Sequence, residues 1–353
     1  MAGMLELPGL IDAHVHLREP GAVHKEDSRT GTGAALAGGF TAILDMPNNA
    51  PATTTASLLA RKNELFAEQA VCDYGLFAGY APVYHSELPE MARQAVGLKL
   101  YLDDTFASSA LLANALEAVF RDWPGPGPIA IHADSSTIPA ALEYARRFEQ
   151  HLHICHVPHP DDLLVIDAAR QKGQRVTCEV TPHHLFLSSA DEARLGAFGC
   201  MKPPLLPPKQ VQQMWQRLHM VDIIASDHAP HTRAEKLGAA PPPGVPGLET
   251  TLPLLLLAVD EGRLTLERLL ELLHTTPARI YGLSADTGTL TVELERFVFP
   301  ETGYQTRCGW SPFAGQSGLG IVKSVMLRAK EVYKDGHVLA QPGAGCSLVS
   351  VRV

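Results

Sequence analysis

The chain has 353 residues, of which 46% are hydrophobic and 19% charged, and its formal net charge is −9. This length suits one large domain or two ordinary ones, and the acidic balance argues against a nucleic-acid partner or an anionic membrane surface. The apolar run TLPLLLLAV at 251–259 is too short to span a bilayer and predicts a buried helix or strand.

Cysteine usage and the first residues bear on the cell compartment. The six cysteines are scattered and form no CxxC pair, which is typical of a reducing compartment. No basic segment precedes an apolar stretch at the N-terminus, so we expect no signal peptide and a cytoplasmic location. Sixteen histidines is a high count, and several of them stand in tight clusters.

Short β-rich runs alternate with helix-length segments along most of the chain. We expect strands at 10–17, 40–46, 72–80, 96–102, 128–133, 152–157, 175–181 and 222–228, and helices that include 53–70, 136–150, 160–172 and 209–219. This alternation favours a parallel sheet of βα units, and eight units predict a closed (β/α)₈ barrel of the TIM type. An open doubly wound sheet is the alternative, weakened because no GxGxxG follows the first strand.

The pattern changes after about residue 284. The segments 288–299 and 321–339 predict strands, the second with a hairpin turn at Asp335-Gly336. We therefore predict a barrel over 1–284 and a small β-rich appendage over 285–353 packed beside it.

Unusual polar residues stand at the ends of five predicted strands. They are His14 and His16, then Lys99, His132, His156 and Asp227. The C-terminal ends of barrel strands share the face on which active sites are built, and strand alternation directs His14 and His16 to the same side. A lone residue of this kind is most often a satisfied core or rim residue, but five such strands favour a metal centre. Neutral imidazoles and a carboxylate suit zinc, and the set exceeds the three protein ligands of one catalytic zinc, which favours two metals.

Lys99 is the unusual member of this set. A protonated lysine repels cations, but a buried one loses its proton readily and can then react with carbon dioxide to form an anionic carbamate. The alternative is an edge-strand lysine whose charged end reaches water. Lys99 considered by itself favours that alternative.

A series of motifs gives the chain a specific resemblance. They are LPGLIDAHVHLREPG, DMPNNAP, GLKLYL, IHAD, HICHV, CEVTPHHLFL, ASDHAPHT and PPPGVPGLET. Together they resemble the dihydroorotases of the amidohydrolase superfamily, above all the dihydroorotase domain of the multifunctional animal pyrimidine-synthesis protein, and the likeness runs from residue 7 to the end. A single HxH is a weak signal, whereas this ordered set is very specific.

The resemblance implies a metal centre with assigned ligands. His14, His16 and Asp227 would hold the first metal and His132 and His156 the second, both expected to be zinc. Carboxylated Lys99 would bridge the two metals together with a hydroxide. The positions of Glu179 and His184 match residues linked to a third zinc, and the alternative for both is support of the other ligands by hydrogen bonding.

The resemblance also implies a substrate site. Arg18, Asn48 and His231 would grip the substrate carboxylate and ring, and the backbone at Pro243 and Gly244 would approach the ring edge. Thr105 and Phe106 in DDTFASS match a lid over the substrate.

Three features depart from the family pattern. Lys202 stands where the family often has asparagine or arginine, and it would meet a carboxylate as a point charge rather than as a fork. Leu206 stands where many bacterial members have arginine. The chain also opens almost on its HxH strand, so we expect no leading β segment and only the C-terminal half of the usual appendage.

These residues imply dihydroorotase activity in pyrimidine biosynthesis. The enzyme would interconvert L-dihydroorotate and N-carbamoyl-L-aspartate, with Asp227 as general base and acid. One alternative is another cyclic amidase such as a hydantoinase or allantoinase, which Arg18 and Asn48 argue against. The other is a non-catalytic scaffold for aspartate carbamoyltransferase, which the intact ligand set argues against. As partners we expect a second copy of the chain in a homodimer and, in some settings, aspartate carbamoyltransferase.

Overall fold

The computed structural model describes residues 3–102, 113–284 and 288–349. The predicted lid residues Thr105 and Phe106 therefore lie outside the described residues. Within the described chain, no helix is both long and apolar enough to cross a membrane.

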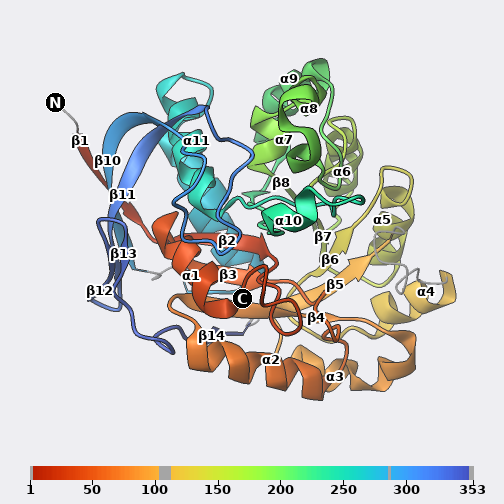
Figure 1. Cartoon of the computed structure of the whole chain (residues 1–353). Coiled ribbons are helices and arrows are strands. Elements are labelled where there is room, and N and C mark those ends of the chain that lie inside the picture. The colour runs from red at the N-terminus through yellow and green to blue at the C-terminus, as the bar shows by residue number, and fades with distance from the viewer. Residues whose placement is uncertain (1–2, 103–112, 285–287, 350–353) are drawn as a thin grey trace.

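Eight parallel strands in the described part of the chain form a barrel, as Figure 1 shows. Each strand pairs with the next in chain order: β2 (Leu10–Val15), β3 (Phe40–Asp45), β4 (Asp73–Gly79), β5 (Gly97–Tyr101), β6 (Ile129–His132), β7 (Leu152–Ile154), β8 (Val176–Val180) and β9 (Ile223–Ile224). A parallel bridge between Val15 and His228 joins the first strand to the segment after the last. The predicted TIM-type barrel is thus confirmed, and its strands are apolar nearly throughout because both faces are covered.

Helices lie between the barrel strands along the chain and also follow the last one. They are α1 (Ser28–Ala37), α2 (Ala56–Gln69), α3 (Leu88–Ala92), α4 (Ala113–Asp122), α5 (Ile138–Arg147), α6 (Asp162–Gln171), α7 (Pro182–Phe186), α8 (Glu192–Leu195), α9 (Pro208–Gln216), α10 (Arg233–Lys236), α11 (Leu248–Asp260), α12 (Leu266–Leu270) and α13 (Thr276–Tyr281). The run TLPLLLLAV lies in α11, whose residues 250–258 are all buried. It is a core helix, one of the two structures that its length allowed.

A second, antiparallel sheet lies beside the barrel. Its strand order is β1 (Gly3–Pro8), β10 (Thr289–Val298), β11 (Ser317–Leu327), β12 (Lys330–Lys334) and β13 (His337–Val338). The expectation that no β segment precedes the HxH strand is wrong, because β1 pairs with β10 along its whole length. The boundary at residue 284 stays a prediction, and strands from both sides of it build this sheet.

The predicted hairpin region holds two turns. The expected turn at Asp335-Gly336 joins β12 to β13, and both residues have positive φ, as this kind of tight hairpin requires. A second turn at Arg328-Ala329 joins β11 to β12, also with positive φ at both residues. Neither Arg328 nor Ala329 is a usual residue for that conformation, so the sequence carried no signal for this turn.

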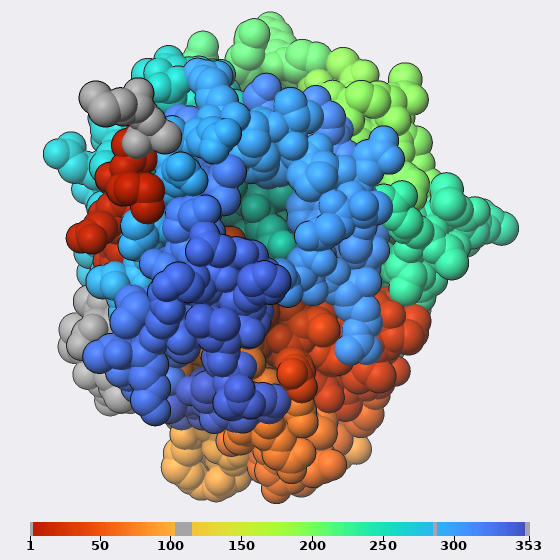
Figure 2. Space-filling view, turned by 60° about the vertical axis from the view of Figure 1, so that its left-hand side comes forward, coloured from red at the N-terminus to blue at the C-terminus, as the bar shows by residue number. Residues whose placement is uncertain are grey.

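The end of the chain returns to the barrel. Strand β14 (Ser347–Leu348) pairs in parallel with the start of β4, and Arg328 Nη1 lies 2.8 Å from both carboxylate oxygens of Asp73. In Figure 2 the blue C-terminal residues cover one side of the molecule and adjoin the red and orange N-terminal segments.

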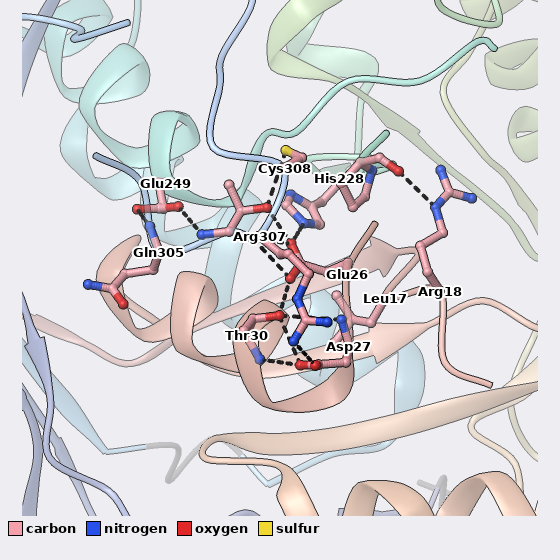
Figure 3. A network of polar contacts seen from close by, with 12 residues as sticks. Leu17, Arg18, Glu26, Asp27, Thr30, His228, Glu249, Gln305, Arg307 and Cys308 are labelled. Carbon is pink, nitrogen blue, oxygen red and sulfur yellow. Dashed lines mark hydrogen bonds and ion pairs between the residues drawn. The ribbon is translucent and has the colours of Figure 1, made fainter. Parts of the chain in front are cut away.

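Two carboxylates fasten the segment between β10 and β11 to the barrel, as Figure 3 shows. Glu249 accepts the backbone N–H groups of Gln305 at 2.9 Å and Thr306 at 3.0 Å. Glu26, which is fully buried, accepts the N–H of Arg307 at 3.2 Å. A little further along, Trp310 Nε1 donates to the backbone oxygen of His231 at 2.7 Å. The appendage thereby supports a residue predicted to bind substrate.

Candidate active site

The HxH strand and the end of the barrel sheet bring three of the predicted ligands together. His14 lies in β2, His16 follows that strand, and their ring centroids are 5.1 Å apart. Asp227 follows β9, and its Oδ1 lies 3.4 Å from His14 Nε2 and 3.1 Å from His16 Nε2. All three side chains are buried at the C-terminal ends of the strands, where the sequence placed them.

The neighbouring strands supply the second group. His132 ends β6, and its Nδ1 lies 2.8 Å from Nε2 of His156, which follows β7. The other ring nitrogen of His156 is buried and has no hydrogen-bond partner among the described residues. His14 and His156 have ring centroids 5.3 Å apart, so the two groups are contiguous.

Lys99 lies on an interior strand. Its side chain extends from β5, which pairs with β4 and β6, and the residue is 1% exposed. The edge-strand interpretation is therefore wrong. Lys99 Nζ lies 2.8 Å from Sγ of Cys155 and lines the same pocket as the histidines.

The electrostatics of the cluster suit a divalent cation. Burial lowers the pKa of His16 to about 4 and that of His156 well below its usual range, so both imidazoles are neutral at pH 7. Burial opposes ionisation of Asp227, but the adjacent His14 and His16 hold the pKa of its carboxyl well below the usual range. Donor atoms of His14, His156 and Asp227 all lie within 4.8 Å of one another. Burial opposes protonation of His14, but the Glu179 carboxylate raises the pKa of this imidazole to about 10, so a metal ion would displace its proton. The neutral imidazoles of His16 and His156 and the ionised carboxylate of Asp227 are donors that zinc prefers, so these residues fit the metal centre.

A second group of possible donors adjoins the first. His14, Cys155 and Glu179 bring one donor atom each within 4.8 Å of the others. Sequence reasoning included Glu179 but missed Cys155, although the thiol directly precedes His156 in HICHV. It also missed His153, whose Nε2 lies 3.0 Å from Glu179 Oε2.

His184 is not part of either group. Its Nδ1 lies 2.7 Å from the hydroxyl of Thr181, and its Nε2 lies 3.1 Å from the backbone oxygen of Pro203. Thr181 is the N-cap of α7 and also accepts the N–H of His184. Thr181 and the backbone of Pro203 thus occupy both ring nitrogens of His184.

Arg18 and His231 form a cationic corner beside the cluster. Arg18 Nε donates to the backbone oxygen of Pro230 at 3.1 Å, drawn in Figure 3, and its Nη2 lies 3.2 Å from His231 Nε2. Lys25 Nζ lies 3.1 Å from the other ring nitrogen, and a lysine can only donate. Burial, Arg18 and Lys25 lower the pKa of His231 to about 3, so the ring is neutral and carries one hydrogen.

The tautomer of His231 follows from these contacts. Since Nδ1 accepts from Lys25, the hydrogen is on Nε2 and points to the backbone oxygen of Pro243, 3.0 Å away. Nε2 then has no lone pair for Arg18. The Nη2 group of Arg18 therefore donates no hydrogen bond to His231.

The other predicted substrate residues line one pocket with the metal-ligand candidates. Its lining includes Arg18, Asn48, Tyr101, Lys202, Pro243 and Gly244. Asn48 Oδ1 lies 2.6 Å from His16 Nδ1, so it both orients a ligand and faces the pocket. Gly244 has φ of +132°, and a Cβ there would lie 2.5 Å from the backbone oxygen of Ala229. Leu206 is a core residue and does not line the pocket.

Backbone strain is concentrated at this site. Among the described residues, seven non-glycine residues have positive φ, and three of them are Arg18, His156 and Asp227. Such conformations cost about 1–3 kcal/mol each and persist where the surrounding structure enforces them, often at functional sites.

Comparison with known proteins places the chain in a family. The amidohydrolase family model matches residues 6–294. The chain belongs to the amidohydrolase family.

Its similar relatives include dihydroorotases. The chain is 44% identical over 346 residues to the multifunctional protein CAD of Squalus acanthias, a match that covers 97% of the chain but only 15% of that much longer protein. It is 33% identical over 390 residues to the dihydroorotase of Methanothermobacter thermautotrophicus, with 97% of the chain and 87% of that enzyme covered.

Solved structures share the fold over almost the whole chain. The L-hydantoinase (dihydropyrimidinase) of Arthrobacter aurescens is 26% identical with a TM-score of 0.91, covering 98% of this chain and 89% of that one. The inactive dihydroorotase-like domain of the Chaetomium thermophilum CAD-like multifunctional protein is 27% identical with a TM-score of 0.82. The match covers 98% of this chain and 99% of that domain.

Proposed function

We propose that the chain is a metal-dependent dihydroorotase that interconverts L-dihydroorotate and N-carbamoyl-L-aspartate. The observation that carries the proposal is the pocket in which the guanidinium of Arg18 lies beside the neutral imidazoles of His16 and His156 and the ionised carboxylate of Asp227. A cyclic amide that bears a carboxylate matches both sides of this pocket. Full-length dihydroorotases more than 30% identical to the chain support the same assignment.

The residues that would hold the metals are those of the cluster. His14, His16 and Asp227 would bind one zinc ion and His132 and His156 another, with carboxylated Lys99 between them. The proximity of Cys155 and Glu179 to His14 supports room for a third ion. Bound divalent ions lower the pKa of water and polarise a carbonyl group.

The chain's own residues would supply proton transfer and orientation. Asp227 is ionised and would accept a proton from the attacking water and deliver it to the leaving ring nitrogen, which requires one carboxylate within reach of both atoms. Arg18 would bind the exocyclic carboxylate through its guanidinium fork. Asn48, Lys202 and the backbone at Pro243 and Gly244 would enclose the ring.

Two other functions remain to be tested against this one. A hydantoinase-type amidase is favoured by the structural likeness to the L-hydantoinase, but the cations Arg18 and Lys202 in the pocket favour a substrate with a carboxylate. A scaffold without activity is suggested by the inactive relative, but the six residues predicted as ligands all line one pocket in this chain, which supports catalysis. A panel of dihydroorotate, hydantoin and allantoin, together with metal content per chain, discriminates among the three.

The pH dependence of the equilibrium tests the assigned reaction. Ring closure joins a carboxylate to a ureido nitrogen, releases water and consumes one proton. The ratio of dihydroorotate to carbamoyl aspartate should therefore fall by about tenfold for each unit of rising pH above the carboxyl pKa values. The ratio is measured by chromatography after both directions reach the same endpoint, and a ratio independent of pH would refute the assignment.

The proposal extends to the pathway, the cell compartment and the partners of the enzyme. The chain would act in pyrimidine biosynthesis in the cytoplasm, as a homodimer. Its likeness to segments of multifunctional proteins supports association with aspartate carbamoyltransferase as a further proposal.

A further inference from the structure

A fully buried ion pair contacts the segments after β2 and β3, which carry the predicted substrate-binding residues Arg18 and Asn48. Lys62 on α2 and Asp45 at the end of β3 are both 0% exposed, and their Nζ and Oδ2 atoms are 2.5 Å apart. Neither residue lines the pocket or belongs to the metal cluster. The role of the pair has to be sought in what else its two charged groups bind.

The ammonium group of Lys62 is used completely. Besides Asp45, it donates to the backbone oxygen of Met46 at 2.7 Å and to Asn49 Oδ1 at 2.8 Å. These two groups flank Asn48 in the loop after β3. Lys62 therefore fixes the loop that presents Asn48 to the pocket.

The carboxylate of Asp45 binds the other substrate-binding element. Its Oδ1 accepts the backbone N–H of Leu17 at 2.7 Å, and Asn49 Nδ2 donates to the backbone oxygen of Glu19 at 2.8 Å. Leu17 and Glu19 are the two chain neighbours of Arg18. The ion pair is thus bonded, directly or through Asn49, to both sides of Arg18, whose φ is +63°.

Stability alone does not account for this arrangement. Replacement of a buried ion pair by apolar residues is often neutral or stabilising, because desolvation of the two charges offsets their attraction. What apolar residues could not supply is the three hydrogen bonds that the pair makes around Arg18 and Asn48, with the N–H of Leu17, the backbone oxygen of Met46 and Oδ1 of Asn49. A site that binds a planar carboxylate requires its groups to be held within about 0.5 Å.

We propose that the Lys62–Asp45 ion pair is a positioning device that sets Arg18 and Asn48 at the spacing required to bind the substrate carboxylate. The inference rests on the proposed dihydroorotase function. Under this proposal, two residues outside the pocket control the affinity for substrate rather than the rate of the chemical step.

The test uses the metal-loaded full chain with both charges of the pair removed. In Asp45→Asn/Lys62→Met no unpaired charge is left in the interior, and the asparagine can still accept the N–H of Leu17. We expect KM for dihydroorotate to rise about tenfold, kcat to change less than threefold, and metal content to stay at the wild-type value. Arg61→Met on the same helix removes an exposed cation that pairs with Glu64 and should leave all three unchanged.

Each outcome bears on the proposal. A folded, metal-loaded double variant with KM within twofold of wild type overturns it, as does a loss of kcat and metal with KM unchanged. Lys62→Met alone should melt at a lower temperature than the double variant, because it strands the buried carboxylate of Asp45. If the wild-type enzyme itself does not turn over dihydroorotate, the proposed function has failed before any variant is compared, and this inference falls with it.

Discussion

Glu249 should make the stability of the fold depend on pH. Burial raises the pKa of its carboxyl from 4.5 to about 7, against the opposing effect of the N–H groups of Gln305 and Thr306 that it accepts. Between pH 4.5 and 7 the unfolded chain therefore loses this proton while the folded chain keeps it. The stabilisation linked to Glu249 is therefore fully present below pH 4.5, its pKa in the unfolded chain. It is lost as the pH rises through about 7, its pKa in the folded chain.

The size of the effect follows from the two pKa values. The difference between 4.5 and about 7 corresponds to about 3 kcal/mol at 1.36 kcal/mol per pKa unit. The Glu249 side chain is partly exposed, so this figure is an upper limit. Because unfolding entropy is about 2.1 cal/mol/K per residue, each kcal/mol lowers the Tm of a chain of 353 residues by roughly 1.3 °C. We expect Glu249 to contribute at most about 4 °C to the fall in Tm from pH 5 to pH 8.

Calorimetric melting of wild type and Glu249→Gln across that pH range measures this contribution. The glutamine cannot ionise, so its Tm should fall less steeply with pH, although its single acceptor oxygen lowers the Tm at pH 5. Glu64→Gln, at an exposed position on α2, controls for the change in net charge and should leave the slope as it is. Parallel curves for wild type and Glu249→Gln would refute the reasoning.

Three further predictions concern the active site. Arg18→Lys keeps the charge but loses the fork, so steady-state kinetics should show kcat/KM lower by about 10- to 100-fold, and an unchanged value would remove Arg18 from substrate binding. Lys99→Ala should lose metal and activity, with partial recovery by short carboxylic acids that replace the carbamate; full metal content in this variant would contradict the bridging role. Asp227→Ala should show no turnover, and activity close to wild type would exclude Asp227 as the base.

The barrel was predictable because each of its strands is a local pattern. An apolar run followed by a helix-length segment recurs eight times, and each strand pairs with its neighbour in the sequence. Strand β1 was missed because the residues of its partner β10 lie 281 to 291 positions away, and nothing local in Gly3–Pro8 indicates that pairing. The turn at Arg328-Ala329 was missed because neither residue is one that favours positive φ.

In the site, too, features set by local sequence were predictable, whereas features set by contacts between distant segments were not. The strand-end positions of His14, His132 and Asp227 were predictable from the alternation of polar and apolar residues. The burial of Lys99 was not, since it depends on β5 lying between two other strands. The ion pair of Lys62 with Asp45 joins a helix to a strand through side chains 17 residues apart, with no periodicity that reveals it.

The strained backbone at the site argues for catalysis over a scaffold role. Arg18, His156 and Asp227 each hold a positive φ, which costs about 1–3 kcal/mol per residue. A chain that served only to bind another protein would gain stability from any change that relaxed these residues. In this chain the strain is held by hydrogen bonds, among them Asp45 to the N–H of Leu17 and Arg18 to the oxygen of Pro230. Such strain, and the bonds that impose it, are expected where the positions of the Arg18 guanidinium and the Asp227 carboxylate determine substrate binding and turnover.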